Sequence, residues 1–138
     1  MYIGFTKAEG AGNDFIIIDN MNKRINLSKD QISYLCSRNL GIGSDGLILV
    51  EPDREADCFM NYYNSEGVED EMYGNGAVCT ALYLNSFLKA HKDDFRINTK
   101  GGINEVARHE DGTYSIKTNN SPLAKIQVKN VFSGTVEI

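Results

Sequence analysis

The chain has 138 residues, a formal net charge of −5 and ordinary fractions of apolar and charged residues, which predicts one globular domain with a real hydrophobic core. Lys and Arg form no cluster, and no apolar run is long enough to cross a bilayer, so neither nucleic acid nor a membrane is an expected partner. The N-terminus lacks a signal-peptide pattern, which makes the cytoplasm the expected location.

Strand and helix patterns alternate in the first half of the chain. The patterns predict strands at residues 3–7, 15–19, 47–50 and 58–63, with glycine-rich turns at residues 9–14 and 39–46. Ser28 is a plausible N-cap, and Gln31 three residues later completes a capping box. A helix is therefore expected from Ser28 to about Arg38.

A longer helix is expected from Asn75 to about Lys89. Its apolar residues cover more than one face, which is typical of a helix buried inside a fold. Further strands are predicted at residues 95–99, 103–108 and 114–118, then one or two strands within 126–131 and 134–138, with a linker at 119–122. The expected fold class is α+β, with a mixed β-sheet in a barrel-like wrap around this central helix.

The turn Gly74-Asn75-Gly76 leads directly into the longer helix. Backbone N–H groups at a helix start lack partners within the helix, and the helix dipole favours negative charge there, so the turn is a candidate anion site. A structural interpretation stands beside it: a tight strand-to-helix turn with Asn75 near the N-cap. Both interpretations can hold together. Tyr73 precedes the turn and would lie against a bound anion.

The cysteines and histidines do not suggest a disulfide framework or a metal site. Cys36, Cys58 and Cys79 are separated by long, unequal gaps, and His91 and His109 are the only histidines. No metal is therefore expected, and each cysteine is interpreted as a small buried apolar side chain.

Several blocks together resemble the diaminopimelate epimerase family. They comprise residues 5–7 with 10–15, 35–38 with 41–46, 64–67, and 72–79, in the family's order and spacing. Residues 128–138 resemble the C-terminal strand of full-length members, which returns to complete the first domain. The resemblance implies one domain over residues 1–138, with 1–120 like the N-terminal domain and 123–138 as its closing strand.

The resemblance implies a cofactor-free, metal-free isomerase that converts LL- to meso-diaminopimelate in lysine and peptidoglycan biosynthesis. Two cysteines, one from each of two similar domains, exchange the α-proton, and two helix N-termini hold the α-carboxylate. Tyr73 stands at the position of one catalytic cysteine, and the second domain is missing. Asn13, Asn64, Gly74 and Asn75 match substrate-binding positions, although Asn13 and Asn64 could instead hold left-handed turns, a conformation that asparagine tolerates.

Tyrosine is a poor substitute for a thiol at this position. Its ordinary pKa is ~10, so about one part in a thousand is ionised at neutral pH, whereas a thiol at ~8.5 is far more available. Tyr73 is also larger than cysteine. The alternatives are a weak phenolate base and an aromatic side chain that fills the pocket.

Two functional hypotheses remain open from the sequence. The first is an epimerase or racemase that acts as a homodimer and is inactive or much impaired. The second is a non-catalytic, self-associating scaffold or binding module, either a natural paralogue or an engineered half-protein. Both predict self-association into a homodimer or higher oligomer, because loss of a packed domain exposes apolar surface. The expected ligand is an amino acid or a small anion, and no cofactor is expected.

Overall fold

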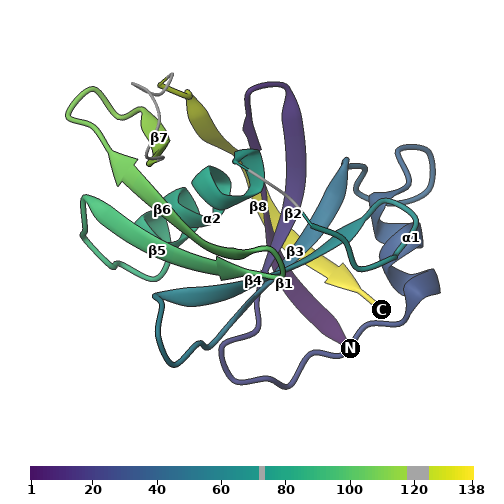
Figure 1. The fold of residues 1–138 in the computed structure, drawn as a ribbon. Coiled ribbons are helices and arrows are strands. Elements are labelled where there is room, and N and C mark those ends of the chain that lie inside the picture. The colour runs from purple at the N-terminus through teal and green to yellow at the C-terminus, as the bar shows by residue number, and fades with distance from the viewer. Residues whose placement is uncertain (72–73, 118–124) are drawn as a thin grey trace.

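The computed structural model describes residues 1–71, 74–117 and 125–138. Within these ranges the chain forms one curved, eight-stranded mixed sheet and two helices (Figure 1). Across the sheet the strands run in the order β7-β6-β5-β4-β3-β2-β1-β8. The elements are β1 (Tyr2–Gly10), β2 (Asn13–Asp19), α1 (Lys29–Cys36), β3 (Gly46–Glu51), β4 (Cys58–Asn64), α2 (Asn75–Ser86), β5 (Asp94–Thr99), β6 (Gly102–Arg108), β7 (Tyr114–Lys117) and β8 (Val128–Glu137).

The sheet curves around α2 until its two edges meet at one point. Neighbouring strands are antiparallel except β2–β3 and β4–β5, which are parallel. The last strand, β8, returns to pair with β1, with Glu137 opposite Tyr2. At the other edge, Tyr114 of β7 exchanges backbone hydrogen bonds of 3.0 and 2.7 Å with Ile126, just ahead of β8. This bridge links β7, the first strand of the sheet order, to the residues just ahead of β8, the last strand.

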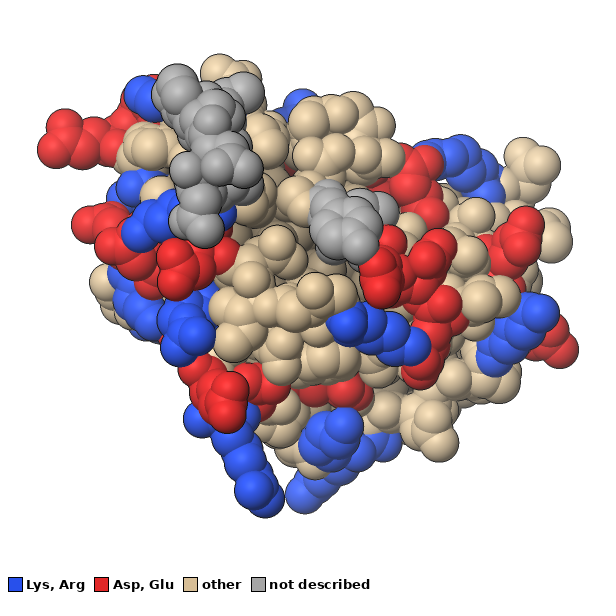
Figure 2. Space-filling view, in the orientation of Figure 1, with Lys and Arg blue, Asp and Glu red and all other residues tan. Residues whose placement is uncertain are grey.

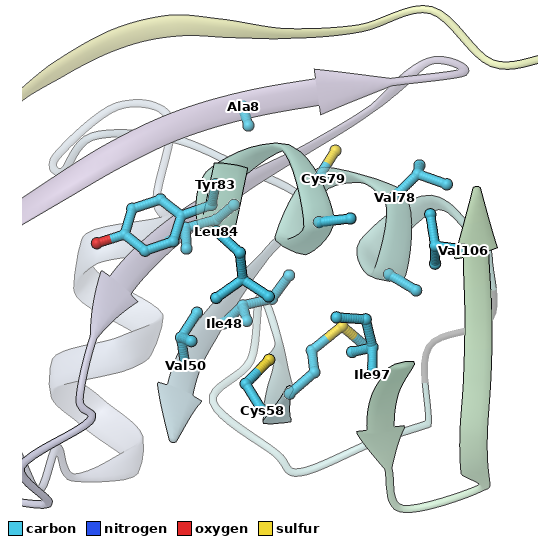
Figure 3. Close-up of a cluster of buried hydrophobic side chains, with 14 of the residues drawn as sticks. Ala8, Ile48, Val50, Cys58, Val78, Cys79, Tyr83, Leu84, Ile97 and Val106 are labelled. Atoms are coloured by element: carbon cyan, nitrogen blue, oxygen red, sulfur yellow. The ribbon is translucent and has the colours of Figure 1, made fainter. Parts of the chain in front are cut away.

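The helix α2 fills the inside of this curve and contacts all eight strands. Figure 3 shows its side chains, including Val78 and Leu84, against Ile48, Ile97 and Val106 of the strands. Every residue from 76 to 81 is buried, so the helix is covered on all sides. The sequence-based prediction of a buried central helix within a mixed sheet is confirmed.

The other helix, α1, covers part of the outer face of the sheet. Ile32 and Leu35 of α1 are buried in a second apolar cluster with Ile16 and Ile18 of β2. The alternate residue of that strand, Ile17, belongs to the cluster around α2. The strand is therefore buried on both faces, which explains its unbroken apolar run.

The start of α1 was predicted correctly and its end was not. The Ser28 side chain accepts the N–H of Gln31 at 3.1 Å, and the Gln31 side chain accepts the N–H of Ser28 at 2.8 Å. The helix ends at Cys36, before the predicted end at Arg38, because Ser37 has an extended backbone with φ −62° and ψ 126°.

The longer helix also ends earlier than its pattern indicates, at Ser86 instead of Lys89. Lys89 has a left-handed backbone with φ 52°, and the N–H of Ala90 donates back to the carbonyl of Leu84 at 3.1 Å. Such a left-handed residue closes many helices, but it is usually glycine. The helix end could not be predicted from the sequence, because lysine is not a usual residue at such a position.

The C-terminal residues form one strand where the pattern allowed one or two. The pairing of β8 with β1 shifts register between Lys7 and Ala8, and β8 continues through this irregularity. The predicted linker at residues 119–122 lies outside the described residues.

On the face in Figure 2, acidic and basic side chains are interspersed around an uncharged region. Within the described ranges, neither helix has the length and apolar character needed to cross a membrane.

We expect Gly46→Ala to lower the free energy of unfolding by about 2 kcal/mol, because extra atoms in a tightly packed site force the structure to shift. A Cβ at this position would lie 2.7 Å from the Tyr62 hydroxyl oxygen and 2.8 Å from the Tyr63 carbonyl oxygen. Urea unfolding measures the effect. Gly4→Ala is the matched control, since a Cβ there meets no atom within 4 Å. Equal losses for the two variants would contradict the packing at Gly46.

Candidate functional site

The residues that the sequence predicted to bind a ligand lie together at one end of the central strands β2, β3 and β4. Asn13 begins β2, Gly46 begins the parallel strand β3, and Asn64 ends the antiparallel strand β4. In the sheet, Gly46 pairs with Asn64 on one side and with Phe15 on the other. The first residues of the parallel strands β2 and β3 therefore lie beside the last residue of the antiparallel strand β4.

The start of α2 is tied to this edge by a direct hydrogen bond. The side-chain amide of Asn75, the first residue of α2, donates to Oδ1 of Asn13 at 2.6 Å. The two residues are 62 positions apart in the sequence. The structure thus brings together two of the predicted site residues and fixes the helix N-terminus beside β2.

Gly74 is the N-cap of α2 and needs to be glycine. Its backbone has φ 68° and ψ −79°, a left-handed conformation that disfavours other residues. Because glycine has no side chain, this residue provides no side-chain hydrogen bond to the N–H groups at the helix start. Backbone N–H groups of a first helical turn point out of the N-terminal end, where they can bind an anion. The position of Gly74 agrees with both interpretations of the glycine turn.

Asn64 has a structural role in the turn that follows β4. Its Oδ1 accepts the N–H of Glu66 at 2.9 Å and the N–H of Val68 at 3.1 Å. The expectation that Asn13 and Asn64 hold left-handed backbones is wrong, because neither has a positive φ. Glycines take that conformation in both turns, with φ 87° at Gly12 and 82° at Gly67.

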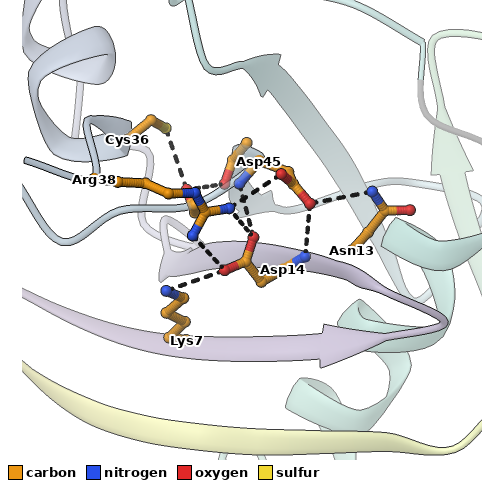
Figure 4. A network of polar contacts seen from close by, with 8 residues as sticks. Lys7, Asn13, Asp14, Cys36, Arg38 and Asp45 are labelled. Atoms are coloured by element: carbon orange, nitrogen blue, oxygen red, sulfur yellow. Dashed lines mark hydrogen bonds and ion pairs between the residues drawn. The ribbon is translucent and has the colours of Figure 1, made fainter.

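A charged network of Lys7, Asp14, Arg38 and Asp45 lies beside Asn13 (Figure 4). Arg38 donates to the two carboxylate oxygens of Asp14 at 2.9 and 3.2 Å, and to Asp45 at 3.1 Å. Lys7 pairs with Asp14 at 3.1 Å. The other oxygen of Asp45 accepts the side-chain N–H of Asn13 at 3.2 Å and the backbone N–H of Asp14 at 3.1 Å. The network therefore connects Arg38, in the segment that follows α1, to the asparagine pair.

Backbone contacts hold Asp14 and Asp45 in register. The N–H of Asp45 donates to Oδ1 of Asp14 at 2.9 Å. The glycine-rich loop that ends at Asp45 folds back on α1, where the N–H of Gly43 donates to the carbonyl of Leu35 at 3.0 Å. Gly43 has a left-handed backbone with φ 85°. This glycine therefore serves the geometry of the glycine-rich turn that the sequence predicted at residues 39–46.

The contacts in the charged network favour its ionised form. Burial opposes ionisation of Asp14, but hydrogen bonds from Arg38, from Lys7 and from the N–H of Asp45 outweigh it and hold the pKa of this carboxyl well below its usual range. The same carboxylate raises the pKa of Arg38. Asp14 and Arg38 are therefore charged throughout the neutral range.

All three cysteines of the chain are buried, as predicted. Cys58 and Cys79 are 0% exposed, and burial raises the pKa of each thiol to about 12. Burial also raises the pKa of Cys36. None of the three can present a thiolate to a ligand at the start of α2.

Tyr73, the candidate base, lies outside the described residues. In the described part, no group of three or more His, Cys, Asp or Glu side chains is placed to hold a metal ion. The sequence alone predicted no role for four charged residues of the site, Lys7, Asp14, Arg38 and Asp45. Three of them lie in or beside the two glycine-rich turns, and charged residues in such turns were the available signal.

The comparisons with known proteins identify the family of this chain. A family model described as Diaminopimelate epimerase matches residues 5–124. The chain belongs to the diaminopimelate epimerase family. Diaminopimelate epimerases of Psychrobacter sp. (strain PRwf-1) and Psychrobacter cryohalolentis are 44% and 42% identical to it over 105 residues. These matches cover 75% of this chain and 36% of each relative, so the chain spans well under half of the relatives' length.

Solved structures with low sequence identity share the fold. A methylitaconate-delta-isomerase has a TM-score of 0.65 at 13% identity, over 99% of this chain and 95% of that chain. A PhzF-family phenazine biosynthesis protein of Bacillus anthracis has a TM-score of 0.62 at 22% identity, over 84% of this chain and 40% of that chain. A hydroxyproline epimerase of Agrobacterium vitis has a TM-score of 0.59 at 14% identity, over 83% and 40%.

We expect the native chain to react slowly with Ellman's reagent at neutral pH, with fewer than about 0.1 thiols per chain modified in the first minutes. After unfolding in urea, all three thiols should react. Ser65→Cys, in an exposed turn, is the positive control and should react at once. Immediate reaction of one thiol in the unaltered native chain would contradict the burial described above.

The ionisation of Asp14 should make the free energy of unfolding depend on pH. Folding lowers its pKa, so its contribution is complete above the unfolded-state pKa of about 3.9 and is lost as the pH falls toward the folded-state value. Asp14→Asn should therefore lower the free energy of unfolding by about 2 kcal/mol at neutral pH. The gap in this free energy between the variant and the unaltered chain should narrow below about pH 4.

Urea unfolding across this pH range measures the gap between Asp14→Asn and the unaltered chain. Asp93→Asn is the matched control, because Asp93 makes a 3.5 Å pair with Arg108 while 78% exposed. A gap for Asp14→Asn that stays constant in acid would refute the role of the Asp14 carboxylate.

Proposed function

We propose that this chain forms the carboxylate-binding half of an epimerase site and binds an α-amino acid at the start of α2. The observation that carries the proposal is the helix start itself, with a glycine N-cap and an asparagine hydrogen-bonded to Asn13 at 2.6 Å. Family membership supports diaminopimelate as the ligand and epimerisation at its α-carbon as the reaction. The cytoplasm, where no disulfides are expected, is the proposed location.

We propose further that the unaltered chain is inactive or much impaired. Epimerisation needs one group to remove the α-proton and another to return a proton on the opposite face. The three thiols are buried, and Tyr73 stands where the family has a catalytic cysteine. A phenol with a pKa of ~10 supplies little base at neutral pH. The chain therefore retains groups for binding and lacks the group for proton transfer.

A second copy of the chain is the proposed partner. In the family resemblance, two similar domains face each other across the substrate, and this chain contains the elements of one. Large apolar side chains are exposed on neighbouring strands, with Tyr2 72% and Phe132 47% exposed, and such side chains favour association. A homodimer or higher oligomer could place two α2 N-termini opposite each other.

The alternative function is a non-catalytic scaffold or binding module that self-associates. The burial of every thiol favours this alternative, because it leaves no cysteine for the family's chemistry. It predicts cooperative folding and self-association without α-proton exchange, including when a thiol is restored at position 73.

Deuterium wash-in distinguishes the two functions. The chain is incubated with diaminopimelate in D₂O, and the α-proton is followed by NMR for the unaltered chain, Tyr73→Cys and Tyr34→Cys. Tyr34 is 53% exposed on α1 and gives a matched tyrosine-to-cysteine control away from the site. We expect exchange in Tyr73→Cys to exceed the other two by about a hundredfold or more, the usual gain from a positioned acid–base group.

The other outcomes reject the proposal in different ways. Rapid exchange by the unaltered chain would show that another group removes the proton. Absence of exchange in all three proteins would favour the scaffold.

A further inference from the structure

The side-chain amide of Asn13 is held at both ends. Its Nδ2 donates to Oδ2 of Asp45 at 3.2 Å, and its Oδ1 accepts from Asn75 at 2.6 Å. The two flipped orientations of a carboxamide have nearly the same shape, so its partners decide which is adopted. An ionised carboxylate can only accept hydrogen bonds, and Asp45 therefore admits only the NH₂ end of Asn13.

We propose that Asp45 is a positioning residue that acts through Asn13 and makes the start of α2 selective for a carboxylate over an uncharged amide. This inference rests on the proposed function and deepens it, because it assigns the ligand specificity of the same site. Asp45 itself makes no contact with the ligand in this proposal. Its effect is to set which hydrogen-bonding group Asn13 presents.

The selectivity follows from the hydrogen-bond inventory of Asn13. Its NH₂ group has two N–H donors, one of which is used by Asp45. The second has no partner among the contacts of the described residues, and in this proposal it is the donor that Asn13 offers to a ligand carboxylate. A flipped Asn13 would present its carbonyl oxygen instead and repel a carboxylate. The orientation that Asp45 imposes therefore favours an acceptor-only anion.

Asp45 is itself held by groups outside the asparagine pair. Arg38 donates to Oδ1 at 3.1 Å and the backbone N–H of Asp14 donates to Oδ2 at 3.1 Å. Its side chain is 40% exposed, so its place is set by these contacts more than by packing. Arg38 is in turn fixed by its two hydrogen bonds to Asp14. The carboxylate of Asp45 is thus aimed at Asn13 before any ligand arrives.

Asp45→Asn tests this directly, because asparagine keeps the shape and can face either end of Asn13. The first measurement uses the free chain: the side-chain NH₂ signals of Asn13 and Asn75 in ¹⁵N-resolved NMR spectra. We expect both to shift in Asp45→Asn and neither to shift in the Asp93→Asn control. An unchanged Asn75 signal in Asp45→Asn would overturn the inference, whether or not the chain binds diaminopimelate.

The second measurement is the affinity for diaminopimelate and for its diamide, from titrations of backbone signals at residues 74–76. In Asp45→Asn we expect about tenfold weaker binding of diaminopimelate and unchanged binding of the diamide. Equal weakening for the two ligands would indicate a merely structural role and overturn the selectivity. Binding of neither ligand by the unaltered chain would reject the proposed function, and the free-chain NMR result would still decide the role of Asp45.

A double-variant comparison checks that Asp45 acts through Asn13. If it does, Asp45→Asn has no further effect on diaminopimelate affinity in an Asn13→Ala background, because the side chain that it orients is gone. Additive losses from the two substitutions would contradict the proposed route.

Discussion

The burial of α2 is the constraint on which the rest of the structure depends. A helix with apolar residues on all sides cannot lie on a surface, so the sheet curves around it and all eight strands contact it. This packing leaves the N-terminus of α2 at the edge where β2 and β3 begin and β4 ends. The candidate site is thus a consequence of how the core is packed, and the hydrogen bond from Asn75 to Asn13 joins the helix start to the sheet.

Binding and proton transfer depend on different parts of this site. An anion would be bound by backbone N–H groups and by side-chain amides, which the packing of α2 and the charged network hold in place. Proton transfer in the family depends on a thiol, and this chain has only buried thiols. In the proposed function, a replacement at position 73 therefore removes the chemistry and leaves the binding groups as they were.

The sequence predicted the features that depend on local patterns. The buried helix, the capping box at Ser28 and the strand spacing all follow from residues close together in the chain. The end of α2 near the left-handed Lys89 was not predicted, because lysine does not normally take that conformation. The charged network was not predicted from the sequence. Its hydrogen bond between Asp14 and Asp45 joins residues 31 positions apart, which the pairing of β2 with β3 brings together.

A crystal structure of the chain grown with meso-diaminopimelate would show whether the start of α2 binds the α-carboxylate. We expect one α-carboxylate within hydrogen-bonding distance of the backbone N–H groups of Asn75 and Gly76 and of the side-chain amide of Asn13. A carboxylate bound away from the start of α2, or a ligand ammonium group at the helix N-terminus, would contradict it.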